Sequence, residues 1–232
     1  MMTLRRSNER GHAEHGWLDT YHTFSFADYF DPRHMGFRSL RVINDDRIGP
    51  GEGFGTHPHD NMEIVTYVID GELEHQDSMG HREVIHTGEL QAMTAGTGIT
   101  HSEYNASAKK PVHLVQIWIR PEKKGLKPGY AQRVFPEAEK KNRLRLVAAK
   151  EAGDGTLKIN QDARIFLAAV DAGAKIEHAL GASRHAWLQV LTGSLSVNGV
   201  TLKEGDGVQV SDEPKLELQG LEKGEILLFD LA

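Results

Sequence analysis

Short segments of β-forming residues recur along the chain between turn signals. Alternating or continuous apolar positions mark candidate strands at 39–44, 64–69, 72–76, 112–119, 187–191, 195–197 and 226–229. Segments of this length, bounded by glycine and polar residues, are typical of antiparallel sandwiches and barrels. Hairpin turns in which glycine supplies a positive φ are predicted at Asp70-Gly71, Thr192-Gly193 and Asn198-Gly199. We therefore predict an all-β fold with little helix, the exception being one short helix near 136–142.

The second half of the chain repeats the pattern of the first. A strand that ends in a glycine turn runs from Tyr67 in the first half and from Gln189 in the second. A Gly-acidic turn and a final apolar strand then follow in both halves, at 112–119 and at 225–231. Such self-similarity is the signature of repeated structural units. We expect two tandem barrels, residues 1–134 and 135–232, with the Lys-, Glu-, Gly- and Pro-rich stretch 121–150 as their connection.

Composition narrows the chemistry that these barrels can carry. The chain has 232 residues, 39% of them hydrophobic, which is enough for two ordinary cores. It contains no cysteine, so thiolate ligands, thiol nucleophiles and disulfides are excluded. A formal charge of -6 disfavours direct binding to nucleic acid. No apolar run reaches membrane-spanning length and no signal peptide is present, so we expect a cytoplasmic protein, and two fused barrels favour a monomer.

Two short motifs contain the residues that are most suited to metal binding. His57 and His59 are separated by one residue, as are His101 and Glu103. In an extended strand this spacing places both side chains on one face of the sheet. Three imidazoles and one carboxylate suit Fe, Mn, Ni, Co, Cu or Zn better than Ca or Mg. An octahedral ion would keep two positions open for a substrate oxygen and a water or O₂. The alternative is a chance pairing, since the chain has thirteen histidines.

The surroundings of these motifs resemble the two cupin motifs. The first extends from Gly51 through His57 and His59 to Gly71, with Glu63 displaced by one residue. The second runs from Gly88 to Asn105, with Thr94 in place of a proline and two extra residues before the histidine. The runs MTAGTGITHSE at 93–103, GFGTHPH at 53–59 and WLDTYHTFSF at 17–26 resemble the pirin family of bicupins.

The resemblance covers essentially the whole chain, and it implies both a fold and a metal site. The fold is a bicupin, two tandem double-stranded β-helix barrels that resemble jelly rolls. The implied ligands of one divalent transition metal ion, iron in the first place, are His57, His59, His101 and Glu103. Glu63, a ligand in many other cupins, is by the same resemblance not a ligand here, and it either orients a ligand histidine or is purely structural.

The resemblance to pirins also implies two alternative functions. One is a quercetin 2,3-dioxygenase type of activity, in which O₂ cleaves a small aromatic substrate, a flavonol, with release of CO. Glu103 is then the residue placed to take a proton from the substrate hydroxyl. The other is a metal-containing regulatory or redox-sensing protein that acts through a protein partner.

The remaining polar and aromatic candidates are expected to be structural. In the second half, the positions equivalent to the four ligands hold Ala179, Gly181, Leu218 and Gly220, so that barrel should bind no metal. We expect solvent exposure for His75, His81 and His86, and ordinary polar roles for His178 and His185. Asn105 and Gln116 could each hydrogen-bond near the metal, but strand-capping or surface roles are favoured for both. Core packing is favoured over a substrate pocket for Phe24, Phe26, Phe37, Phe54 and Trp118.

Overall fold

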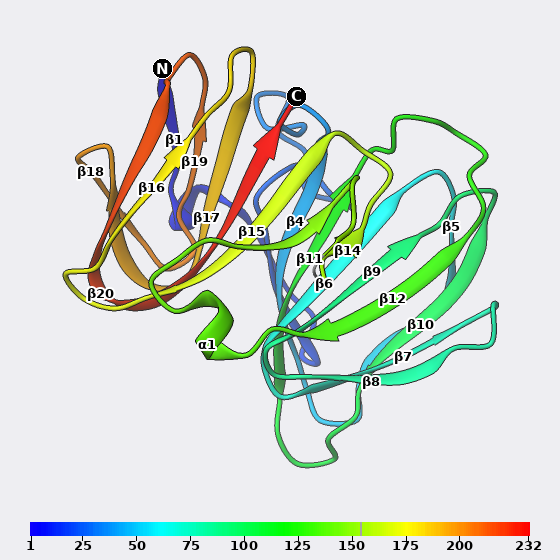
Figure 1. Ribbon diagram of the computed structural model, residues 1–232. Coiled ribbons are helices and arrows are strands. Elements are labelled where there is room, and N and C mark those ends of the chain that lie inside the picture. The colour runs from blue at the N-terminus through cyan, green and yellow to red at the C-terminus, as the bar shows by residue number, and fades with distance from the viewer. Residues whose placement is uncertain (154) are drawn as a thin grey trace.

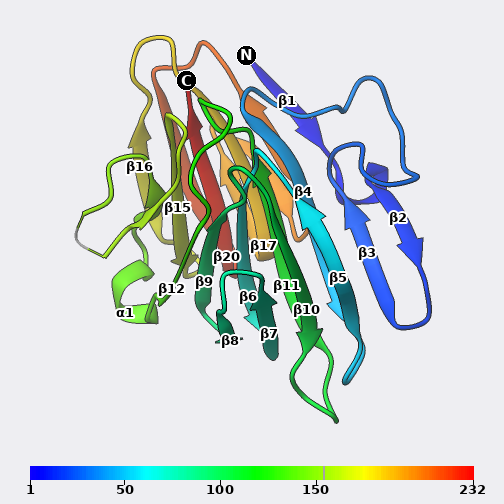
Figure 2. The same ribbon diagram turned by 90° about the vertical axis from the view of Figure 1, so that its right-hand side faces the viewer.

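The chain folds into two β-rich lobes that lie side by side (Figures 1 and 2). The structure is a computed structural model that describes residues 1–153 and 155–232. The described residues contain one α-helix, α1 (Glu137–Lys140), and one 3₁₀ turn, η1 (Ser7–Glu9). None of their helices is long and apolar enough to cross a membrane. The predicted all-β fold with little helix is confirmed, and the short helix lies within the predicted segment 136–142.

The first barrel consists of a seven-stranded and a four-stranded sheet. The larger sheet has the strand order β12 (Gly129–Val134), β9 (Glu89–Thr94), β6 (Glu63–Asp70), β11 (Val112–Ile119), β4 (Leu40–Ile48), β3 (Leu18–His22), β2 (Gly11–Glu14). The smaller sheet has the order β5 (Gly53–His59), β10 (Ile99–Asn105), β7 (Glu72–Asp77), β8 (Arg82–His86). Apolar residues from both sheets, among them Val68, Leu73 and Leu114, pack in one buried cluster.

The second barrel is built from one nine-stranded sheet. Its main path has the order β1 (Met2–Arg5), β19 (Gly207–Val210), β17 (His185–Val197), β20 (Lys215–Leu231), β15 (Ala163–Val170), β13 (Arg145–Ala149), β14 (Leu157–Lys158). Two further strands pair with β20 and β17, namely β16 (Lys175–Ala179) and β18 (Val200–Lys203). The first strand of the chain, β1, thus pairs with a strand of the second half, whereas the boundary at 134/135 stays a prediction.

The three predicted hairpin turns have different outcomes. Asn198-Gly199 joins β17 to β18 as a two-residue hairpin, and both residues have a positive φ. Asp70-Gly71 instead connects β6 to β7, which belong to different sheets. The hairpin predicted at Thr192-Gly193 is wrong, because β17 continues through these residues with shifts of register against β20. A bulge in a continuous strand uses the positive φ of glycine just as a hairpin turn does, so the dipeptide alone could not distinguish a bulge from a turn.

A shared apolar core joins the barrels. Phe24 and Tyr67 of the first half belong to the same buried cluster as Trp187 and Phe229 of the second. The rings of Phe24 and Trp187 lie 4.8 Å apart between centroids. Phe37 packs against this cluster from the first half. The predicted core roles of Phe24 and Phe37 are therefore confirmed, and both serve the contact between the barrels.

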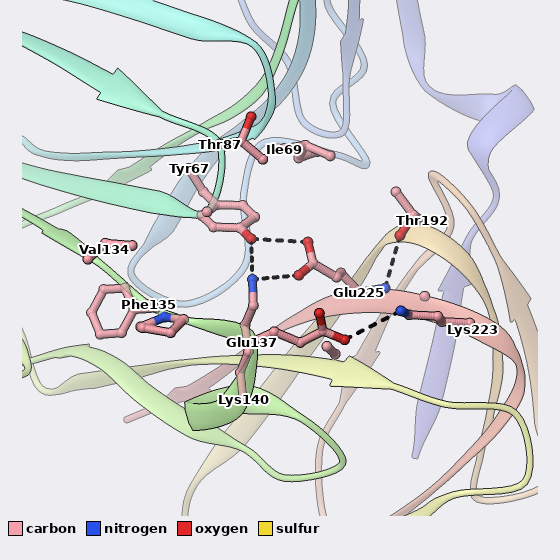
Figure 3. Close-up of a pocket in the computed structure, with 14 residues that line it drawn as sticks. Tyr67, Ile69, Thr87, Val134, Phe135, Glu137, Lys140, Thr192, Lys223 and Glu225 are labelled. Carbon is pink, nitrogen blue, oxygen red and sulfur yellow. Dashed lines mark hydrogen bonds and ion pairs between the residues drawn. The ribbon is translucent and has the colours of Figure 1, made fainter.

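A cavity of about 530 Å³ opens between the barrels beside α1 (Figure 3). Two buried polar groups, Tyr67 and Lys140, meet the half-buried Glu225 at its wall. The Lys140 ammonium donates to Tyr67 Oη at 2.7 Å and pairs with Glu225 Oε1 at 2.6 Å, while Tyr67 Oη donates to Glu225 Oε2 at 3.0 Å. Burial, reinforced by the charge of Glu225, raises the pKa of Tyr67, so this phenol stays protonated. The contact ties the connecting helix to both barrels.

Candidate metal centre

Three of the predicted ligands converge on one point inside the first barrel. β5 and β10 are antiparallel neighbours, with His101 opposite His57 and Ile99 opposite His59. Each histidine offers one nitrogen, and the three nitrogens lie within 4.8 Å of one another. The register then shifts so that Glu103 lies opposite Phe54, which marks a bulge beside the site. The alternation of side chains along two paired strands is what brings these imidazoles together.

The imidazoles of this group have nitrogens that are free for coordination. Burial, with the neighbouring histidines, lowers the pKa of His59 to about 4 and that of His101 to about 3. His59 Nε2 and both nitrogens of His101 are buried and have no hydrogen-bond partner among the described residues. His57 Nδ1 lies 2.8 Å from the Gly55 carbonyl oxygen. A carbonyl only accepts, so Nδ1 carries the hydrogen and Nε2 of His57 is free.

Glu103 lies deeper and is held by two amides. It is 1% exposed, and its carboxylate oxygens accept hydrogen bonds from Gln91 Nε2 at 3.0 Å and from Gln116 Nε2 at 2.7 Å. Each carboxylate oxygen has two acceptor sites, so one site on each remains for an ion or a proton. Glu103 forms a second candidate group with His101 and His75, rather than grouping directly with His57 and His59. Gln116 is thus a partner of the site, and the strand-capping or surface role predicted for it is wrong.

His75 corrects another expectation, because it is buried and not exposed. Its relative exposure is 0%, and its Nε2 lies 3.2 Å from Asp77 Oδ2. In β7 the buried positions alternate as Leu73, His75 and Asp77. The sequence contains this alternation, but two of the three residues are polar, so the pattern did not indicate a buried face. Of the other two histidines near this turn, His86 is exposed as expected, whereas His81 is half-buried against Asp77.

The remaining polar candidates lie away from the ligand groups. Glu63 accepts hydrogen bonds from Thr94 Oγ1 at 2.8 Å and from Asn160 Nδ2 of the second barrel. Burial raises the pKa of Glu63 by more than these hydrogen bonds lower it. Asn105 Nδ2 donates to the backbone carbonyls of Ile48, Gly49 and Lys110, which agrees with its predicted structural role. In the second barrel, His178 contacts Asp230 and His185 contacts Ser211, as ordinary polar side chains do.

A surface cavity of about 510 Å³ opens beside the metal-binding group. It is lined by Pro58, His59, Asp60, Ser78, Gly98, Ile99 and Thr100. Trp118 stands edge-on to His59 at 4.9 Å, and Phe26 packs edge-on against Trp118 at 5.3 Å. Of the five aromatic residues assigned to the core, Trp118 therefore forms a wall of the site, with Phe26 behind it. Phe54 packs on Trp17, at 5.3 Å.

The donor set fits a divalent transition metal ion. Neutral imidazoles and one carboxylate are the ligands that such ions prefer over all-oxygen cages. Buried nitrogens without hydrogen-bond partners are costly unless a ligand satisfies them. The hydrogen bonds that orient His57 and Glu103 are also typical of partners that fix metal ligands.

Comparison with known proteins places the chain in a family. The family model described as Pirin matches residues 3–119, and one described as the quercetinase C-terminal cupin domain matches residues 146–231. Quercetin 2,3-dioxygenase of Escherichia coli K12 is 51% identical over 231 residues, covering 100% of this chain and 99% of the relative. A putative quercetin 2,3-dioxygenase of Pseudomonas aeruginosa is 44% identical over 233 residues, covering 100% of both chains.

Solved structures agree with this placement. The crystal structure of a bacterial pirin from E. coli in complex with nickel(II) superposes with a TM-score of 0.95 at 50% identity. The match covers 100% of this chain and 99% of that chain. Since the matched family models, the full-length relatives and the fold all agree, the chain belongs to the pirin family of bicupins.

Proposed function

We propose that this protein is a metal-dependent dioxygenase of the quercetin 2,3-dioxygenase type, with His57, His59, His101 and Glu103 as the ligands of one divalent ion. The observation that carries the proposal is the convergence of three imidazoles, two of which have buried nitrogens without hydrogen-bond partners among the described residues, next to a carboxylate that two amides hold. The names of the E. coli and P. aeruginosa relatives supply the substrate class. Iron is the ion we propose for the native protein, and the nickel(II) complex of the E. coli pirin supports a site for a divalent transition metal ion.

The chain's own residues have defined parts in this reaction. The flat aromatic substrate enters through the cavity beside His59, whose ring packs against Trp118. When bound, the ion supplies positive charge that lowers the pKa of the substrate hydroxyl. Glu103 takes the hydroxyl proton, while Gln91 and Gln116 hold its carboxylate in place. The flavonol then reacts with O₂, and ring cleavage releases CO.

Oxygen uptake and CO release with quercetin test this proposal. Protein loaded with Fe(II) or Ni(II) should consume O₂ and release CO in equal amounts. His57→Ala should lose both the metal and the activity, whereas His86→Ala, at an exposed histidine of β8, should keep both. If loaded wild type shows neither O₂ uptake nor CO release, the dioxygenase function is wrong. Elemental analysis of the protein as purified identifies the native ion.

A further inference from the structure

His75 lies beside two of the proposed ligands but belongs to no ligand set implied by the sequence. It is on β7, directly opposite Glu103 of the neighbouring strand β10. One of its nitrogens lies within 4.8 Å of ligand atoms of His101 and Glu103. Its Nδ1 is buried and has no hydrogen-bond partner among the described residues. A buried acceptor or donor in this state requires a partner that the chain itself does not provide.

Asp77 determines which hydrogen-bonding role this nitrogen has. Asp77 accepts hydrogen bonds from the backbone N–H of Met79 at 2.8 Å and from His81 Nδ1 at 2.9 Å. Because Asp77 already acts as an acceptor toward a backbone N–H, the contact of 3.2 Å between His75 Nε2 and Asp77 Oδ2 is one in which Nε2 donates. In the tautomer that this hydrogen bond selects, Nδ1 carries a lone pair.

The ring is also fixed in direction. Tyr130 of β12 stacks on His75 with ring centroids 4.6 Å apart, and it stacks on His81 at 4.9 Å. Asp77 holds the other edge of the His75 ring. The imidazole is thus held in one orientation beside His101 and Glu103.

The spacing between His75 and the neighbouring ligand atoms suits one bridging oxygen atom. A water molecule with hydrogen bonds or ligand bonds on two sides joins atoms that are about 4.5 to 5.5 Å apart. Nδ1 makes no direct hydrogen bond to Glu103 or His101, although one nitrogen of His75 lies within 4.8 Å of ligand atoms of both. The position is on the buried side, since His75, His101 and Glu103 are at most 1% exposed, whereas His57 and His59 are partly exposed.

We propose that His75 Nδ1 accepts a hydrogen bond from a water molecule of the metal centre on its buried side. This inference rests on the proposed function. It makes His75 a positioning residue, and it divides the open coordination positions into two kinds. The buried position holds a retained water, and the position that faces the cavity beside His59 is left for substrate.

Counting water ligands on a bound ion tests this role. The probe is Mn(II) alone, with its bound water detected by electron–nuclear double resonance in H₂¹⁷O. His75→Phe keeps an aromatic ring against Tyr130 but removes both nitrogens. We expect one water fewer in this variant than in wild type. We also expect a loss of Mn(II) affinity below tenfold by chelator competition, far smaller than that of His57→Ala.

Two results would overturn the proposal. An unchanged water count in His75→Phe means that His75 holds no water. A loss of affinity as large as that of His57→Ala means that His75 binds the ion directly. Should wild type bind no divalent metal at all, the proposed function itself fails. If wild type binds metal and His75→Phe leaves the water count unchanged, only the role of His75 fails.

Two further variants supply an independent test and a control. Asp77→Asn leaves the His75 ring in place but introduces an amide that donates to Nε2, so Nδ1 carries the hydrogen and no longer accepts. It should lose the same water, which covers the case in which His75→Phe does not fold. His86→Phe makes the same substitution at an exposed histidine of β8 and should retain the wild-type count.

Discussion

At the residue scale, Glu103 shows how the chain prepares a carboxylate for an ion. Gln91 comes from β9 and Gln116 from β11, on either side of the ligand strand in sequence. Gln91 Nε2 also donates to Thr66 Oγ1 at 3.0 Å, which fixes the direction of the amide. Both glutamines therefore restrict the carboxylate before any metal arrives, and this restriction should appear as metal affinity.

Gln116→Leu should weaken metal binding about tenfold, because Glu103 loses a 2.7 Å hydrogen bond without losing its charge. Competition for Ni(II) with a chromogenic chelator measures the effect. Gln76→Leu, at an exposed position of β7, is the matched control and should bind as wild type does. An unchanged affinity in Gln116→Leu would show that the amide does not support the ligand.

Asp46 predicts a pH dependence of stability in the metal-free protein. Burial raises its pKa to about 7, even though Thr20 Oγ1 donates to its Oδ1 at 2.5 Å. The folded state therefore binds a proton that the unfolded state releases above pH 3.8, and stability falls as pH rises from 3.8 to about 7. Asp46→Asn removes this loss and should be more stable than wild type at pH 8, by up to about 4 kcal/mol.

Urea unfolding at pH 4 and pH 8, at one ionic strength, measures this difference. Near pH 4 the two proteins should have similar free energies of unfolding, because Asp46 is then largely protonated in the folded state. Asp28→Asn, at an exposed position, should show no such divergence. A constant difference between Asp46→Asn and wild type at both pH values would contradict the raised pKa.

Residue-scale prediction from the sequence succeeded where both members of a contact share a motif. The spacing of His57 and His59 identified them, and the structure brings them to His101. Gln91 and His75 were missed as partners of the site, and another role was favoured for Gln116, because each of them reaches the site through strand pairing that the sequence does not specify. Only the alternation of Leu73, His75 and Asp77 in β7 carried a usable signal.

At the element scale, the pattern of apolar residues predicted where strands lie more accurately than where they begin and end. The segment predicted at 112–119 coincides with β11, and 72–76 falls one residue short of β7. The segment 226–229, however, is only a small part of β20, which runs from Lys215 to Leu231. Exposed charges and two glycines interrupt the apolar pattern there, although pairing with β16 and β17 continues. Hydrogen bonding to neighbours, which no local pattern records, sets such ends.

The contact that ties α1 to β6 and β20 predicts strong coupling between Lys140 and Glu225. Their side chains are 6% and 22% exposed, and the ions are 2.6 Å apart. Lys140→Met should lower the free energy of unfolding by about 3 kcal/mol, because it leaves Glu225 without its cation. Adding Glu225→Gln should then cost much less than Glu225→Gln costs alone.

A double-mutant cycle by urea unfolding measures this coupling. The exposed pair of Lys223 and Glu137 lines the same cavity at 3.4 Å and serves as the control. Lys223→Met should change stability by less than about 1 kcal/mol. Additive effects of Lys140→Met and Glu225→Gln would show that the pair does not act as a unit.

At the scale of the whole molecule, the internal repeat predicted two barrels but not how they combine. One apolar cluster draws on both halves, and β1 pairs across to β19. Asn160 of the second half also reaches the buried carboxylate of Glu63 in the first. Neither half buries its surface alone, so we expect both barrels to unfold in one cooperative transition.

Trp187→Ala tests that cooperativity because Trp187 lies in the second barrel and packs on Phe24 and Phe37 of the first, at 4.8 and 6.0 Å between centroids. The variant should lose about 3 to 5 kcal/mol of unfolding free energy, as expected for a large buried aromatic residue. Leu221→Ala, at a residue that is 44% exposed, should change the free energy of unfolding little.

Calorimetry should show one endotherm for each protein. Ni(II), whose proposed ligands are all in the first barrel, should raise the midpoint temperature of this single transition. Two endotherms in the wild type, with Ni(II) moving only one, would mean that the shared core does not join the barrels into one folding unit.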